Sequence, residues 1–314
     1  MGAIALLLFL CICIMPSHAL AASTADAKEP ISPEKVSSLS VKYSCEGIDF
    51  AELPVKLYKI ADVAADFQYT LTDRFDESGL VLNGIQTVGE WNVIRSTLES
   101  FILANEVAHD FEVATDEGGY ASFESLTTGL YLAVTVNAEI DGYIYSFDSA
   151  LVSVPSLGSD GIWQYDVAVN AKPEVIPPIE GDDLLDFKVI KLWKGDSGLK
   201  GRPKSIEIEI YRDGKLFETV KLSEENLWMY SWQAEKDGAV WQVVERNVPI
   251  GYTMTLEQRE ATFVVTNTRN GEPPDPTPPP QTGDSFNILW YIIIMFVSGS
   301  ALVLLGGKRK RNDL

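Results

Sequence analysis

The chain has 314 residues, a formal net charge of −20, three cysteines and two histidines. Such an acidic balance disfavours nucleic acid and anionic lipid as partners, because both would repel it. The cysteines and histidines show no metal-ligand spacing, and there is no Gly-rich phosphate loop. The sequence therefore predicts no cofactor, no metal site and no His-based catalytic triad.

The first 21 residues are typical of a secretory signal peptide. An apolar stretch runs from Ala3 to Met15, and Ala19-Leu20-Ala21 is a small–any–small cleavage site. We therefore expect the chain to be exported and residues 1–21 to be removed. Cys45 is then the one remaining cysteine, so an internal disulfide cannot stabilise the exported protein.

Residues 30–172 predict a mainly β domain with one helix. Between Glu90 and Val107, apolar residues recur at helical spacing, which predicts an amphipathic helix whose apolar stripe packs on a β-sandwich as core. The predicted strands are Ser38–Ser44, Val55–Ala61, Gly119–Phe123, Gly129–Val136, Tyr143–Val154 and Trp163–Asn170.

The end of this domain carries a lysine in a distinctive pattern. Trp163 is followed at fixed spacing by Val167, Val169 and Lys172. This resembles the pilin motif of Gram-positive pilus shaft proteins, although Asn170-Ala171 replace its Tyr-Pro. The resemblance implies that Lys172 attacks the thioester between sortase and the threonine of the next subunit. The alternative is that Lys172 is a solvated linker lysine.

Residues 173–183 are rich in proline and acid, which is typical of a linker. Residues 184–270 then alternate apolar and polar positions over about seven short strands, and Arg212-Asp213-Gly214-Lys215 is a hairpin turn. The sequence thus predicts a mainly β protein with two tandem immunoglobulin-like sandwiches, the first with an inserted helix, followed by a C-terminal transmembrane helix.

Three polar residues interrupt the apolar faces of the second sandwich. Lys191, Glu245 and Asn267 all fall on the core-facing side of their strands by period-two alternation. Burial favours the neutral amine of a lysine and the protonated acid of a glutamate. A neutral Lys191 could then attack the Asn267 carboxamide, polarised by Glu245, and expel ammonia. Lys188 is an alternative donor, but its parity directs it away from the core.

The segments around these residues resemble the collagen-adhesin B-type domain. They are Val189–Trp193, Arg202-Pro203, Glu245–Tyr252 and Val265–Thr268. The resemblance implies an autocatalytic isopeptide bond between Lys191 and Asn267, promoted by Glu245. A second such bond in the first domain, between Asn170 and Lys56 or Lys59, is less favoured because Thr135 stands where the promoting acid is expected. The other interpretation of Lys191 and Glu245 is an ordinary ion pair.

The C-terminus combines three signals in order. Residues 271–282 form a Pro-rich stalk with the motif Pro279-Pro280-Gln281-Thr282-Gly283; residues 288–305 are apolar enough to span a membrane; residues 308–314 form a basic tail. This order resembles the cell-wall sorting signal of Gram-positive surface proteins, with Pro279 in place of the usual leucine. The resemblance implies that sortase recognises Pro280 and cuts between Thr282 and Gly283. The alternative is a plain membrane anchor.

We therefore expect a non-enzymatic structural protein of a Gram-positive cell surface, anchored in the wall. Its expected partners are sortase and either a peptidoglycan precursor or a neighbouring pilin subunit. It would serve as a pilus subunit or a pilin-like stalk. The alternative is a monomeric wall-anchored adhesin whose first domain binds a host ligand.

Overall fold

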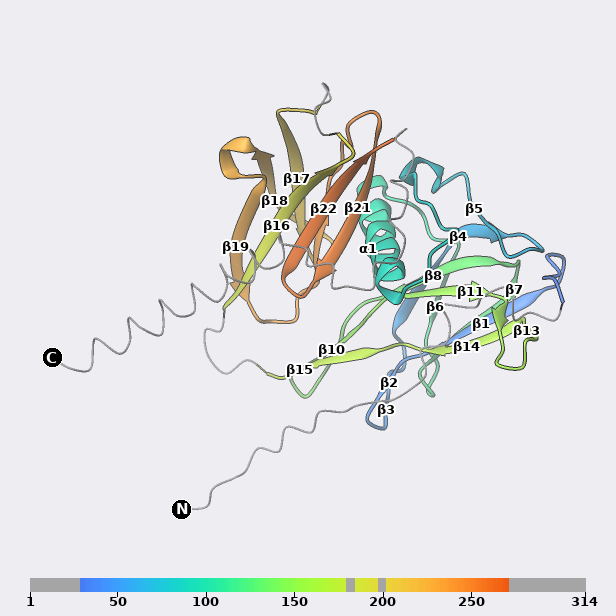
Figure 1. The fold of residues 1–314 in the computed structure, drawn as a ribbon. Coiled ribbons are helices and arrows are strands. Elements are labelled where there is room, and N and C mark those ends of the chain that lie inside the picture. Colours follow the sequence, from blue (N-terminus) through green and yellow to red (C-terminus); the bar gives the residue numbers. More distant parts are fainter. Residues whose placement is uncertain (1–28, 179–183, 197–201, 271–314) are drawn as a thin grey trace, which may run out of the picture. The chain divides into compact units, whose positions relative to one another are not determined.

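Short strands make up most of the protein, as the period-two alternation predicts. A computed structural model describes residues 29–178, 184–196 and 202–270. Within them the protein is mainly β, with a single α-helix (Figure 1). We call residues 29–178 the N-terminal sheet region and residues 184–270 the C-terminal sandwich.

The N-terminal sheet region contains several small sheets. Strand β4 runs between β8 and β5, with β11 beyond β8, and β6 also pairs with β4. A second sheet has the order β14-β1-β7, and a third β15-β10-β9; β2 pairs with β3 and β12 with β13. The strands are β1 (Ser37–Lys42), β2 (Ser44–Cys45), β3 (Ile48–Asp49), β4 (Pro54–Val63), β5 (Tyr69–Leu71), β6 (Phe111–Ala114), β7 (Tyr120–Leu126), β8 (Gly129–Thr135), β9 (Ala138–Ile140), β10 (Tyr143–Phe147), β11 (Ala150–Val154), β12 (Ser156–Leu157), β13 (Trp163–Gln164), β14 (Asp166–Asn170) and β15 (Pro173–Ile176).

The predicted helix is present as α1 (Val88–Asn105). Thr87 and Glu90 form a capping box at its N-terminus, which satisfies backbone N–H groups that the first turn leaves unpaired. Its apolar residues Trp91, Ile94 and Leu98 are buried in a core with β4, β8 and β11. The expectation that the apolar stripe is core is therefore confirmed.

The C-terminal sandwich consists of two sheets. One has the order β19-β16-β22-β21 and the other β18-β17-β20. Apolar residues from both sheets, such as Val189, Ile208 and Phe263, form one core. At the hairpin between β17 and β18, Asp213 and Gly214 both have positive φ, as a two-residue type I′ turn requires. The strands are β16 (Leu184–Lys194), β17 (Ser205–Arg212), β18 (Lys215–Ser223), β19 (Met229–Glu235), β20 (Trp241–Val244), β21 (Tyr252–Arg259) and β22 (Thr262–Arg269).

The structure differs from the predicted elements in several places. The strand expected at Trp163–Asn170 is two strands, β13 and β14, interrupted at Tyr165. The strand expected at Tyr143–Val154 is two strands, β10 and β11, interrupted at Asp148 and Ser149. Pro173–Ile176, within the segment expected to be a linker, pairs with β10 as the edge strand β15. The short strands β5, β6 and β9 have no expected counterpart, because three or four residues carry too little alternation to be recognised.

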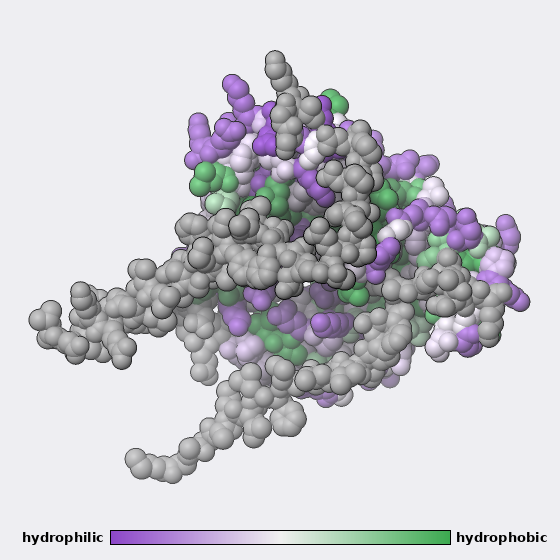
Figure 2. Space-filling view, in the orientation of Figure 1, coloured by the Kyte–Doolittle hydropathy of each residue, from purple (hydrophilic) through white to green (hydrophobic). Residues whose placement is uncertain are grey.

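The described residues belong to a single compact unit. On the visible face, polar side chains separate small apolar patches (Figure 2). Among the described residues, no helix is both long and apolar enough to cross a membrane. The expected signal peptide, the stalk with its sorting motif, the span at 288–305 and the basic tail all lie outside the described residues.

Candidate functional site

Three strands bring together the polar residues that the alternation places in the core of the C-terminal sandwich. Lys191 is on β16 and Asn267 on the parallel neighbour β22, while Glu245 directly follows β20 of the facing sheet. In the register of β16 and β22, Lys191 lies opposite Val265 and Trp193 opposite Asn267. The lysine and the asparagine are therefore two residues apart on adjacent strands, on the same face.

All three side chains are buried, and one carboxylate joins them. Lys191 and Glu245 are each 3 % exposed and Asn267 is 0 % exposed. Lys191 Nζ donates to Glu245 Oε2 at 2.6 Å, and Asn267 Nδ2 donates to Glu245 Oε1 at 2.9 Å. The carboxylate thus bridges an amine and a carboxamide in a site without solvent access.

Burial changes the protonation of the lysine. Desolvation lowers the pKa of the Lys191 ammonium to about 8, although the nearby Glu245 carboxylate opposes that shift. The neutral amine is the nucleophilic form of lysine. The neutral amine is therefore formed far more easily at Lys191 than at a solvated lysine.

The carboxamide of Asn267 has one unsatisfied atom. Its Oδ1 is buried without a hydrogen-bond partner, while its Nδ2 binds Glu245. A half-turn of the amide about its Cβ–Cγ bond exchanges these two atoms. Oδ1 would then accept a proton from a protonated Glu245, which would polarise the carbonyl carbon.

An aromatic and ionic cluster closes one side of the site. The Trp193 ring lies 4.9 Å from Lys191 Nζ and 5.3 Å from the Arg202 guanidinium. Arg202 forms two hydrogen bonds to the buried Asp196, at 2.8 and 2.6 Å, and the Tyr252 hydroxyl donates to Asp196 at 3.1 Å. The Arg202 hydrogen bond is the main reason that the pKa of Asp196 is lowered. The burial and the contacts of Asp196 could not be predicted from the sequence, in which the one signal is a lone acid shortly before Arg202-Pro203.

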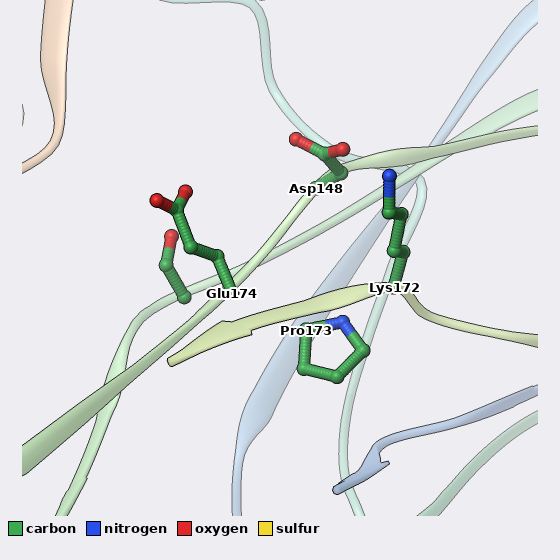
Figure 3. Close-up of a pocket in the computed structure, with 5 residues that line it drawn as sticks. Asp148, Lys172, Pro173 and Glu174 are labelled. Atoms are coloured by element: carbon green, nitrogen blue, oxygen red, sulfur yellow. The ribbon is translucent and has the colours of Figure 1, made fainter. Parts of the chain in front are cut away.

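Lys172 lies outside any core. It follows β14, is exposed, and lines a pocket of about 250 Å³ with Ser146, Asp148, Pro173 and Glu174. Figure 3 shows the side chains of Lys172 and Glu174 on one side of β15 and Pro173 on the other. The break between β10 and β11 places Asp148 at this pocket (Figure 3).

The residues before Lys172 hold its strand in place. Trp163 is buried, stacks on Phe67 and donates through Nε1 to the Glu29 carbonyl at 2.8 Å. Val167 packs into the core, and the backbone N–H of Ala171 donates to the Lys42 carbonyl at 2.9 Å. Trp163 and Val167 are thus buried and Val169 is partly buried, while the lysine is left at the surface.

We call Lys191, Glu245 and Asn267 the triad. The described residues of the N-terminal sheet region contain no comparable buried group of a lysine, an acid and an asparagine. Lys56 and Asn170 are exposed, and Lys59 pairs with Asp62 and Thr127 at the surface. Lys191 is the one lysine among the buried residues that the structure describes. The geometry does not bring Lys56 or Lys59 together with Asn170 in a buried site. Lys188, the alternative donor in the C-terminal sandwich, is exposed on β16.

The remaining site residues expected from the sequence lie outside the described part of the chain. Pro280, Thr282 and Gly283 of the sorting motif fall outside the described residues. In the part of the chain that the structure describes, no three His, Cys, Asp or Glu side chains are grouped so that they could hold a metal ion.

Comparisons with known proteins give one match in sequence and several in structure. Residues 187–268 match the family model of the Cna protein B-type domain. No curated protein matches the chain.

The similar solved structures share little sequence with the chain. A single B repeat unit of the collagen-binding surface protein of Staphylococcus aureus is 14% identical, with a TM-score of 0.25; the alignment covers 76% of this chain and 100% of that one. The shaft pilin SpaA from Lactobacillus rhamnosus GG is 11% identical, with a TM-score of 0.28 and coverages of 76% and 100%. The major pilin SpaD from Corynebacterium diphtheriae is 13% identical, with a TM-score of 0.27 and coverages of 76% and 67%.

The matched segment is the one that contains Lys191, Glu245 and Asn267. Residues 187–268 are therefore similar to the Cna protein B-type domain.

Proposed function

We propose that the C-terminal sandwich forms an amide bond between Lys191 and Asn267, and that the protein is a structural subunit at a Gram-positive cell surface. One observation carries the first part. A buried amine and a buried carboxamide share the Glu245 carboxylate, at 2.6 and 2.9 Å. A buried ion pair contributes little net stability by itself, so a chemical role accounts better for its presence in an otherwise apolar core.

The reaction begins with a proton transfer along the short Lys191–Glu245 hydrogen bond. This gives a neutral amine and a protonated carboxyl group, without a net change in the charge of the pair. Glu245 then donates its proton to the Asn267 carbonyl oxygen, which makes the carbonyl carbon more electrophilic. Lys191 Nζ attacks that carbon and forms the new C–N bond.

The second half of the reaction expels ammonia. The attacking nitrogen gives up a proton, which Glu245 relays to the departing Nδ2. As the old C–N bond breaks and the carbonyl re-forms, its oxygen returns its proton to Glu245, which ends as a protonated carboxyl group. One amine and one primary amide thus become one secondary amide and one NH₃, with no oxidant or other reactant. The product replaces a buried charge and an unsatisfied carboxamide by a neutral link between the first and last strands of the sandwich.

Intact mass tests this chemistry. The chain should be lighter than its sequence by about 17 Da, the mass of the ammonia lost when the amine attacks. Peptide mapping should recover a branched fragment that joins Lys191 and Asn267. A chain with its full sequence mass would contradict the proposal.

The second part of the proposal concerns attachment. We infer that sortase cleaves between Thr282 and Gly283 and joins Thr282 to an amine of the wall or of another subunit. The motif at 279–283, the apolar segment and the basic tail support this inference by their order. Thr282→Ala should leave the protein membrane-bound and extractable with detergent. If the Thr282→Ala variant is still released only by wall-degrading enzymes, the inference is wrong.

Lys172 is the proposed acceptor amine when subunits are joined to one another. It is exposed, and the backbone around it is held by β14 and β15. The open pocket beside it leaves room for an incoming threonyl group. Proteins of similar fold include structures described as shaft and major pilins. The protein would then polymerise head to tail, with the amide-locked sandwich in each repeating unit.

Denaturing gels distinguish a polymer from a single adhesin. A sortase-linked pilus subunit should run as a ladder of high mass, and Lys172→Ala should abolish the ladder while monomers still reach the wall. Lys56→Ala, at another exposed lysine, is the matched control. A ladder that persists in the Lys172 variant would assign the acceptor role to another lysine. A parent strain without a ladder would favour the monomeric adhesin.

A further inference from the structure

Both sheets of the C-terminal sandwich end at helix α1. Strand β20 is an edge strand of one sheet and β21 an edge strand of the other. An uncovered edge presents backbone N–H and C=O groups without partners. Helix α1 lies beside β21 in Figure 1 and supplies a hydrogen bond to each of the two edge strands.

Two hydroxyl groups on α1 make these bonds. The Ser100 hydroxyl donates to the Val243 carbonyl of β20 at 2.9 Å. The backbone N–H of Leu256, on β21, donates to Thr97 Oγ1 at 2.9 Å. Thr97 and Ser100 are each 2 % exposed, and residues three apart in sequence share one face of a helix. One helix face therefore holds both sheets at a fixed spacing.

Helix α1 forms hydrogen bonds to the chain just before and just after Glu245 in sequence. Val243, the acceptor of the Ser100 hydroxyl, precedes Glu245 by two residues. Arg246 follows Glu245 directly, and its Nη1 donates to the Ala104 carbonyl in the last turn of α1 at 2.7 Å. The same guanidinium binds Glu209 of β17 at 2.9 Å. The segment that carries the acid is thus attached to the helix before and after the acid.

The other two members of the triad belong to the sheet that Thr97 contacts. Asn267 lies opposite Met254 of β21, and Val265 lies between Leu256 and Lys191 in the strand register. The reaction needs the carboxyl of one sheet to reach the amine and the amide of the other. Their separation depends on the spacing that α1 holds.

We propose that Thr97 and Ser100 are positioning residues for the amide bond of the C-terminal sandwich. Helix α1 of the N-terminal sheet region would align Glu245 with Lys191 and Asn267, so that bond formation depends on the contact between the two regions. This inference rests on the proposed Lys191–Asn267 chemistry.

The rate of bond formation tests it. The full chain is synthesised in a cell-free system with detergent, samples are quenched at intervals, and the fraction lighter by one ammonia is read from intact mass. The double variant Thr97→Val with Ser100→Ala removes both hydroxyls and keeps the side chains close in size. We expect closure to slow by roughly ten- to a hundredfold, because misplacing a reacting group by about 1 Å costs about that much.

Two controls separate positioning from a general effect on the helix. Thr97→Ser keeps the hydroxyl and should close at the wild-type rate. Ser96→Ala removes a buried hydroxyl from α1 that is not among those bonded to β20 or β21 in the described residues, and it should also close normally. Closure of the double variant at the wild-type rate would overturn the inference. If the double variant does not fold, Ser100→Ala alone decides in the same way.

The test distinguishes this inference from the proposal on which it depends. A wild-type chain that never loses ammonia contradicts the amide chemistry itself and with it the positioning role. If wild type closes and the hydroxyl variants close equally fast, the chemistry stands and the positioning role is wrong. Hydrogen exchange of the Leu256 amide, which should accelerate in Thr97→Val, checks separately that the contact exists in solution.

Discussion

In both regions of the protein the first strand pairs in parallel with a later strand, but the two regions place the polar residues of these strands on opposite faces. In the N-terminal sheet region, β1 runs parallel to β14, and Lys42 lies directly opposite Asn170. In the C-terminal sandwich, β16 runs parallel to β22, which carries Asn267 near Lys191. Each region therefore has a lysine on its first strand and an asparagine on a later strand that runs parallel to it.

The difference is which side of the sheet they occupy. Lys42 follows the fully buried Val41, so strand alternation turns it outward, where it pairs with Asp49 at 2.7 Å and contacts the Gly118 carbonyl. Asn170 is exposed. A shift of one residue exchanges the two faces of a strand. The lysine and the asparagine are therefore exposed to solvent in the N-terminal sheet region, whereas in the C-terminal sandwich they contact a buried carboxylate. Residue type alone does not create the reactive site; burial with an acid does.

Removing the acid should make the C-terminal sandwich the weaker of the two regions. Glu245→Ala leaves Lys191 buried without its partner, which costs about 3–5 kcal/mol. It also prevents closure of a loop that encloses most of the sandwich, and in the chain-entropy treatment used for disulfides such a loop is worth roughly 4–5 kcal/mol. Intact mass should equal the sequence mass, and the melting temperature and protease resistance should fall.

Lys188→Ala is the matched control for that experiment. Lys188 is exposed on the same strand as Lys191, and its replacement should leave both the mass and the melting temperature unchanged. Loss of ammonia in the Glu245 variant at the normal rate would show that the acid is not needed.

A lysine introduced into the core of the N-terminal sheet region, where no acid can pair with it, should lower the stability of that region. Val41 is 0 % exposed, and Val41→Lys places an ammonium in an apolar core. We expect a loss of about 3–5 kcal/mol, the cost of an uncompensated buried charge, measured by denaturant unfolding. Ser40→Lys, one residue earlier and only partly buried, is the control. If the two variants were equally stable, the face of β1 on which the lysine lies would have no effect on stability.

The pH dependence of closure tests the role of Glu245 as proton donor. The reactive pair carries one proton in total, shared between Lys191 and Glu245. With the pKa of Lys191 lowered to about 8, the pair loses that proton above about pH 8. The closure rate should then be level below this pH and fall about tenfold per unit above it, if proton donation is required. A rate that rises up to pH 8 and stays level would mean that only the neutral amine matters.

The smallest effect should come from the lysine that faces outward. The chain should lose a single ammonia rather than two, because Lys42 and Asn170 lie in contact with water. Lys42→Ala should leave the mass loss of about 17 Da unchanged, because its amine does not take part in the attack. The stability cost of losing its surface ion pair with Asp49 should be about 0–1 kcal/mol. A second ammonia lost in wild type, and retained in this variant, would contradict the comparison.

Much of the candidate site follows from local patterns in the sequence. Alternation with a period of two is enough to predict the core-facing positions of Lys191 and Asn267, because strand geometry fixes which side chains share a face. The helical spacing between Glu90 and Val107 is enough to predict α1 and its buried stripe. The same patterns could not predict the short strands or the break at Asp148, because each covers too few residues to show a period.

Contacts between distant parts of the chain were decided by the tertiary structure alone. Thr97 and Ser100 look like ordinary polar residues on the outer face of an amphipathic helix, yet they bond to Leu256 and Val243, 159 and 143 residues away. Asp148 falls inside the strand expected at Tyr143–Val154, yet it lies between β10 and β11 and lines the pocket of Lys172. Periodicity reports which face of an element is buried, and it holds no information on which element covers that face. Only the packed chain determines that helix α1 closes the edges of the C-terminal sandwich.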